Sequence, residues 1–222
     1  MQMKSTKQLT TLAMLSAIAC VLMLVVRINF MPAAPFLIYD PKDIIIALGG
    51  FILGPIAVVA MSFIVSFVEM ITVSADGWVG FAMNVLSSCS FALPAAIIYR
   101  QMRTLKGAVL GLIIGWLFVT GVMIMWNYII TPIYRGFPRA AIVPMLSTIF
   151  LPFNLIKYGL GSATTMLLYK PLSHALQKAK LIEKPDSQVV KKGSFVTGII
   201  LAVCLAVVPV LVLIFVLHGV IF

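Results

Sequence analysis

Six long apolar stretches, separated by short polar segments, run along the 222-residue chain. An α-helix needs about 20 residues to cross a hydrocarbon core of ~30 Å, and each stretch is at least about that long. Because lipid offers no partner to a free backbone polar group, this pattern predicts an all-α integral membrane protein. The stretches cover residues 8–28, 44–74, 79–99, 107–130, 142–169 and 194–218.

The second stretch is too long for one membrane helix. Its roughly 31 residues would form a helix of about 46 Å, which overshoots a bilayer. The pair Gly54-Pro55 lies inside it, and such a pair breaks or kinks a helix. We therefore predict a short helix over 43–53 and a longer one over 55–73. The expected fold is a six-helix bundle with an additional C-terminal hydrophobic helix.

Three regions follow from this division of the chain. Residues 1–172 are predicted to form the six-helix membrane domain, and residues 194–222 an additional C-terminal hydrophobic segment. Residues 173–193 between them are rich in lysine. We interpret this stretch as a basic cytoplasmic linker that lies along the membrane surface and has no chemistry of its own.

Composition and charge fit a membrane protein. Hydrophobic residues make up 62% of the chain and charged residues 10%, and the mean hydropathy is +1.15. The net charge of +10 does not indicate a nucleic-acid partner, because the basic residues flank the apolar stretches. Placing the N-terminus in the cytoplasm satisfies the positive-inside rule. An unsplit second helix with the N-terminus outside satisfies it equally, so the orientation depends on the break at Gly54-Pro55.

Catalytic and metal-binding motifs are missing from the sequence. It has no phosphate-binding loop, no zinc-protease motif and no nucleophile elbow. The three cysteines, Cys20, Cys89 and Cys204, lie inside apolar stretches without metal or redox spacing, so we interpret them as packing residues. We expect a chain that is not an enzyme, hydrolyses no ATP itself, and has no catalytic residue, metal or cofactor.

Polar side chains within the predicted membrane helices mark a candidate site, because burying them in lipid is costly. All of them fall near the middle of a helix or toward its outer end. Together with polar residues of the first outer loop, they are expected to line one cavity that opens to the outside. The candidates are Tyr39, Asp40 and Asp43 in that loop, and Glu69, Asn84, Asn127, Asn154 and Lys157 in the helices.

Asn154 and Lys157 are the most informative of these residues. They lie three positions apart and share one helix face, and Pro152 is expected to bend the helix beside them. A lysine at this depth either pairs with an acid, for which Glu69 is the only candidate within a helix, or contacts a ligand. We favour the ligand.

Side-chain amides beside aromatic rings suit a flat heterocycle. An amide presents a donor and an acceptor that complement an amide edge, and rings stack on its faces. Two other interpretations stay open: such an asparagine can simply join two membrane helices, and a tryptophan at a helix end can anchor the membrane interface. The neighbouring aromatic residues are Trp78, Trp126, Tyr128 and Phe153.

Ala13 and Ala17 form a small-x-x-x-small pair on the first helix. Such a pair allows another helix to approach closely. The pattern alone does not distinguish packing inside the bundle from docking of a partner.

The chain resembles a known family, the riboflavin-specific substrate-binding subunits (S components) of energy-coupling-factor (ECF) vitamin transporters. The resemblance extends over about residues 8–172, and the order and spacing of its short blocks make it specific. The blocks are YDPKD, GGFILGP, GFAMNVLSS, WNYIITPIYRGFPR, PFNLIKYGL and LLYKPLS.

The resemblance implies a six-helix bundle in the bacterial cell membrane, with a cytoplasmic N-terminus and riboflavin bound under the first outer loop. It implies assembly with a transmembrane coupling subunit and two ATPase subunits, whose hydrolysis topples the loaded bundle across the membrane. Ala13 and Ala17 match the docking face for the coupling subunit. The family's flavin contacts match Asn127, Asn154 and Lys157, with contributions from Asn84, Tyr39, Asp40 and Asp43.

The sequence departs from the family pattern in two places. Lys42 and the run Ile44–Ile46 stand where relatives have a small polar residue and a proline, and about 50 residues follow the last shared block. A stand-alone secondary transporter of a vitamin or similar solute is the alternative function, although we find no inverted repeat. A purely structural membrane protein is a third possibility.

Overall fold

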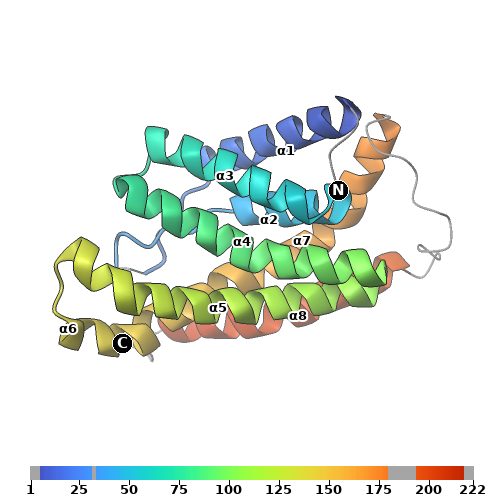
Figure 1. Ribbon diagram of the computed structural model, residues 1–222. Coiled ribbons are helices and arrows are strands. Elements are labelled where there is room, and N and C mark those ends of the chain that lie inside the picture. The colour runs from blue at the N-terminus through green and yellow to red at the C-terminus, as the bar shows by residue number, and fades with distance from the viewer. Residues whose placement is uncertain (1–5, 32–33, 180–193, 218–222) are drawn as a thin grey trace.

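The computed structural model describes residues 6–31, 34–179 and 194–217, and in these ranges the fold is helical (Figure 1). An isolated β-bridge between Ile28 and Tyr39 is the strand-like pairing there. The helices are α1 Thr6–Val25, α2 Lys42–Leu53, α3 Pro55–Thr72, α4 Gly77–Met102, α5 Leu105–Arg135, α6 Arg139–Met145, the π-helical turn η1 Leu146–Phe150, α7 Leu151–Lys178 and α8 Ser194–Leu217.

The six-helix bundle with an additional C-terminal helix is confirmed. In the described part of the chain, six helices are long and apolar enough to cross a membrane: α1, α3, α4, α5, the continuous helix through α7, and α8. The remaining bundle helix, α2, has 12 residues and measures only about 18 Å. It therefore crosses only part of the membrane.

The predicted break in the second apolar stretch is confirmed at Gly54. This residue has φ 97°, in the left-handed region that favours glycine, and Pro55 opens α3 directly after it. The chain reverses here between α2 and α3, so the two helices lie side by side (Figure 1).

The conformation of Gly54 leads to a stability prediction. A Cβ at Gly54 would meet no atom within 4 Å, so Gly54→Ala tests backbone strain alone. With φ 97° and ψ 177°, a conformation that almost only glycine adopts, we expect a loss of about 1–3 kcal/mol in the free energy of unfolding. Gly121→Ala in α5 is the matched control, because its Cβ also meets open space without a positive φ. It is expected to be neutral or stabilising. Denaturant unfolding in detergent measures both, and equal effects would contradict the strain.

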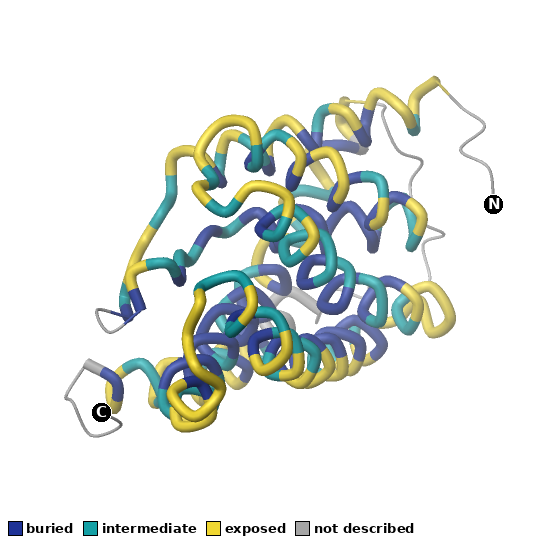
Figure 2. The backbone as a smooth tube through the Cα atoms, turned by 60° about the vertical axis from the view of Figure 1, so that its left-hand side comes forward, coloured by how far each residue is buried: buried dark blue, intermediate teal, exposed yellow. Residues whose placement is uncertain are grey.

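Helix α2 forms the centre of the bundle. Residues 42–51 are all buried. Figure 2 shows that the buried, dark blue turns lie in the interior of the bundle. A helix surrounded by protein on every side has no polar face, which explains the uninterrupted run Ile44–Ile46. The run Ile44–Ile46, which departs from the family pattern, thus forms part of the buried surface of this central helix.

The outer connection between α5 and α7 is more helical than the sequence indicates. Helix α5 extends to Arg135, beyond the apolar stretch 107–130, and α6 begins at Arg139, before the apolar stretch 142–169. The irregularity expected near Pro152 takes the form of the π-turn η1, where the Leu151 N–H donates to the Leu146 carbonyl. Proline in the following turn disfavours ordinary α-helical bonding here.

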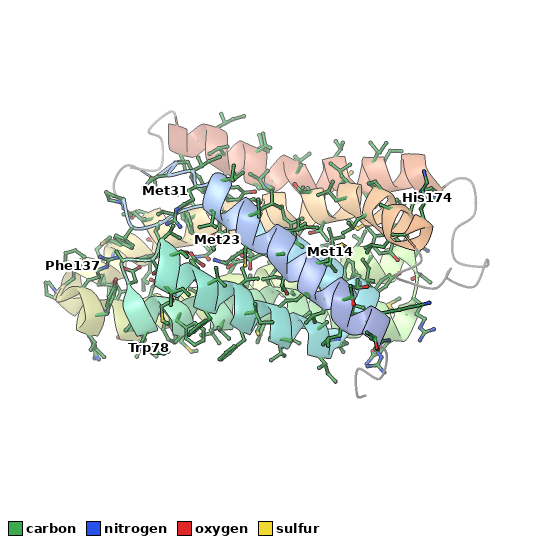
Figure 3. The ribbon with its side chains drawn as sticks, turned by 90° about the horizontal axis from the view of Figure 1, so that it is seen from above. Met14, Met23, Met31, Trp78, Phe137 and His174 are labelled. Atoms are coloured by element: carbon green, nitrogen blue, oxygen red, sulfur yellow. The ribbon has the colours of Figure 1, made fainter. Side chains whose placement is uncertain are left out.

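Helix α8 lies against α7 and runs antiparallel to it (Figure 1). Its last described residues therefore lie near α6, at the end of the bundle that holds the loop between α1 and α2. Figure 3 shows the two ends: Met31, Trp78 and Phe137 lie at one, and His174 at the other. We refer to the end with Met31 as the outer end. Residues 173–178, at the start of the predicted linker, continue α7, and residues 180–193 lie outside the described residues.

Candidate functional site

The loop between α1 and α2 covers the outer end of the bundle, and its two sides are joined by hydrogen bonds. The Ile28 N–H donates to the Tyr39 carbonyl at 3.0 Å, and the Tyr39 N–H donates to the Ile28 carbonyl at 2.8 Å. The Asn29 amide donates to the Pro35 carbonyl at 2.8 Å. These bonds direct Asp40 inward, onto the first turn of α2.

Lys42 is the centre of a buried ion cluster. Its side chain is fully buried, and its Nζ lies 2.5 Å from Glu69 Oε2 and 3.4 Å from Asp40 Oδ2. It also donates to Asn84 Oδ1 at 3.2 Å. One ammonium thus joins the outer loop to α2, α3 and α4.

Lys157 approaches the same cluster from α7. Its Nζ lies 3.1 Å from Asp40 Oδ2 and 3.6 Å from Asp43 Oδ2. The other oxygen of Asp43 accepts a hydrogen bond from Ser88 of α4. Asp40 is therefore shared between Lys157 and Lys42.

These contacts correct the prediction that Glu69 is the acid available to Lys157. Glu69 pairs with Lys42, and the acids that pair with Lys157 come from the outer loop and the start of α2. The physical reason is the shortness of α2. Because this helix has only 12 residues, the loop reaches into the bundle to join it and brings Asp40 beside Lys157.

Charge holds the loop in this position. The cluster has three carboxylates and two ammonium groups, and all five side chains are buried. Burial raises the pKa of the Asp40 carboxyl, but the charges of Lys157 and Lys42 outweigh it and lower that pKa to about 2. Asp40 is therefore ionised at neutral pH, and it pins the loop to two helices.

The asparagines of α5 and α7 are buried but bond within their own helices. Asn127 donates to the Met123 carbonyl at 2.7 Å and accepts from Thr131 at 2.9 Å. Asn154 donates to the Phe150 carbonyl at 2.7 Å. Each amide group has a second N–H, so each can still donate to a ligand. No hydrogen bond between described residues joins Asn127 or Asn154 to the ion cluster.

The aromatic residues divide into two groups. Phe153 of α7 stacks on Phe30 of the loop, with ring centroids 5.3 Å apart, and Phe30 in turn contacts Tyr39. Trp78 is 70% exposed and Tyr128 is 43% exposed, so both face outward. The membrane-anchor interpretation of Trp78 is the better one, and Phe153 and half-buried Trp126 remain as inward candidates.

The structure thus brings together Asp40, Asp43, Lys157 and Asn84 among the predicted site residues, and it places Tyr39 in the loop above them. Lys42 and Phe30 were missed by the sequence reasoning. Lys42 had a signal, because a lysine directly before a continuous apolar run is costly unless it is paired. Phe30 had none.

Comparisons with known proteins identify the family. The profile for the substrate-specific component of ECF transporters matches residues 7–169. The chain belongs to the ECF transporter S components. A solved structure of the S component of a bacterial ECF transporter covers 77% of this chain and 98% of its own, with 32% identity and a TM-score of 0.65.

Curated relatives extend this result. A riboflavin transporter of Staphylococcus aureus is 34% identical over 185 residues, which cover 80% of this S component and 96% of the relative. A riboflavin transporter of Bacillus subtilis is 32% identical over 162 residues, which cover 68% of this S component and 84% of the relative. Members of this family are substrate-binding components of transporters and not enzymes, as the sequence predicts. Helix α8 lies beyond the residues that the family profile matches.

Proposed function

We propose that this S component captures riboflavin at the outer face and delivers it to the cell as the substrate-specific subunit of an ATP-driven ECF importer. The two relatives described above are named as riboflavin transporters. The observation that carries the proposal is a set of hydrogen-bonding groups at the outer end, beneath the loop between α1 and α2, most of which are buried. This set is Asn84, Asn127, Asn154 and Lys157 in the helices and Tyr39, Asp40 and Asp43 at the lip.

The chemistry of these groups fits a neutral flavin. Its ring system has an edge of alternating carbonyl oxygens and ring nitrogens, which side-chain amides match with donors and acceptors. The negative charges beside Lys157 already balance its ammonium. Lys157 therefore serves the flavin as a directional donor and not as a counter-ion.

Coupling to energy requires partners, because the sequence has no ATP-binding loop. Ala13 and Ala17 are exposed on α1, whereas Leu12, Leu15 and Ser16 are buried against the bundle. A stripe of small residues is therefore free for the transmembrane coupling subunit. Two ATPase subunits would supply the hydrolysis that topples the loaded bundle, with the N-terminus in the cytoplasm of a bacterial cell.

The inner half of the bundle argues against the alternative of a stand-alone secondary transporter. Phe51 of α2 contacts the ring of Tyr99 of α4 at 4.7 Å and that of Tyr169 of α7 at 5.9 Å, and the two tyrosine hydroxyls bond to each other. These rings fill the space between three helices. A carrier that alternates its access would have to separate these three helices in its inward-facing state.

A purified sample tests the proposal directly. We expect the protein to take up riboflavin and to show flavin absorption after gel filtration, and its tryptophan fluorescence to fall on titration with riboflavin. Trp126→Phe should reduce that quenching, whereas Trp78→Phe, at an exposed position, should not. No binding by the wild-type chain would overturn the proposal. Uptake into proteoliposomes by this chain alone, without ATP, would favour the secondary transporter.

A further inference from the structure

The end of α8 takes part in an apolar cluster at the outer end of the bundle, which we term the outer apolar cluster. It joins three parts of the chain: the loop between α1 and α2, the segment from η1 into α7, and α8. Its buried members are Met31, Ala34, Leu37, Ile149, Phe150, Phe153, Ile156 and Val216, with Val212 and Leu213 of α8 packed against them.

Helix α8 is closely seated on α7 and is not a loose appendage. A Cβ at Gly159 of α7 would lie 2.8 Å from Pro209 Cγ of α8 and 2.8 Å from Trp116 Cζ2 of α5. Only glycine leaves room for this contact. The position of α8 along α7 is thereby fixed, and with it the position of Val216 beside the loop.

The loop is consequently held at two points by different forces. Asp40 is held from below by the ammonium groups of Lys42 and Lys157. Met31 and Leu37 are held from the side by the outer apolar cluster, in which Met31 is fully buried. Figure 3 shows Met31 at the same end of the molecule as the last turns of α8. Opening of the loop, to admit or to release a substrate, would break the second set of contacts.

We propose that α8 is a brace for the substrate loop, and that Val212 and Val216 are positioning residues that slow the release of bound flavin. The inference rests on the proposed function. It assigns a role to the segment after residue 169, which the family profile does not match. Loss of the apolar contacts of Val212 and Val216 is expected to favour the open loop. The hydrogen bond of Asn154 and the ion pairs of Lys157 do not involve α8 and should be unchanged.

Full-length double variants test the brace. Val212→Ala/Val216→Ala removes side-chain volume from the outer apolar cluster. Val203→Ala/Val207→Ala is the matched control, with the same chemistry and spacing on the same helix but with side chains that are 59% and 49% exposed. We expect the first variant to release riboflavin about ten-fold faster, equivalent to about 1.4 kcal/mol. The control should keep the wild-type rate in a stopped-flow chase.

A second measurement reports the loop without any flavin. In a background that carries Met31→Cys and has the native cysteines Cys20, Cys89 and Cys204 replaced by alanine, modification by a membrane-impermeant maleimide should be slow, and Val212→Ala/Val216→Ala should accelerate it. Unchanged modification and release rates in that variant, with binding by the wild type intact, would overturn the brace alone. Equal acceleration by the control pair would do the same. Absence of binding by the wild type would instead count against the proposed function.

Discussion

Riboflavin binding is expected to weaken, by up to about a hundred-fold, when Lys157 is replaced by methionine. The variant removes a directional donor that projects from α7 toward the loop, and methionine keeps much of the side-chain volume without an N–H. A buried donor that pairs with a ligand typically contributes several-fold to a hundred-fold in affinity, about 1–3 kcal/mol. Quenching of tryptophan fluorescence in a riboflavin titration measures the change.

The ion cluster requires a control for this variant. Lys157→Met also removes the ammonium group that pairs with Asp43. It should therefore lower the free energy of unfolding, by up to about 5 kcal/mol. Lys157→Met/Asp43→Asn restores the charge balance, and the oxygen of the introduced amide can still accept from Ser88. We expect this double variant to regain stability but not binding. Recovery of both would show that Lys157 only balances charge. Lys106→Met, at an exposed position, should change neither.

Replacement of Lys42 by methionine is expected to have the largest effect on stability. The ammonium of Lys42 is fully buried and contacts Asp40, Glu69 and Asn84. Its removal leaves Glu69 as an unpaired buried charge, and breaking a buried ion pair in this way costs about 3–5 kcal/mol. Denaturant unfolding in detergent, with and without riboflavin, measures the loss.

A charge-compensated variant again separates the causes. In Lys42→Met/Glu69→Met both partners become apolar, and such a replacement is often neutral when the packing is good. We expect the double variant to regain most of the stability that the single variant loses. Asp40 then still has Lys157 as its partner. If the double variant were no more stable than Lys42→Met, the pair with Glu69 would not be what holds Lys42 in place.

The helices could be predicted from the sequence because each depends on local features. Hydropathy over about 20 residues identifies a membrane helix, and the pair Gly54-Pro55 marks the reversal between α2 and α3. The extent of α5 and the helical turns of α6 could not be read in this way. Both lie partly in residues 131–144, where polar and apolar residues are mixed and hydropathy does not distinguish a helix from a loop.

The sequence predicted which residues belong to the candidate site better than it predicted how they pair with one another. Asp40, Asp43 and Lys157 do lie together, but their pairing depends on how deeply the loop descends, which is a property of the assembled bundle. The orientation of Trp78 depends on the rotation of α4, which a nearly uniform apolar helix does not encode. The flavin contacts, the docking role of Ala13 and Ala17, and the three-region division of the chain stay predictions.

The shortness of α2 also bears on the distance that a substrate has to travel. Twelve residues span about 18 Å of a hydrocarbon layer of ~30 Å, so with the reversal at Gly54 placed at the inner boundary the N-terminus of α2 lies roughly 12 Å beneath the outer boundary. A molecule that contacts Asp43 and Lys157 would therefore already be about a third of the way across the hydrophobic barrier. Under the proposed function, capture would therefore bring the substrate part of the way across this barrier before the energy-coupling step.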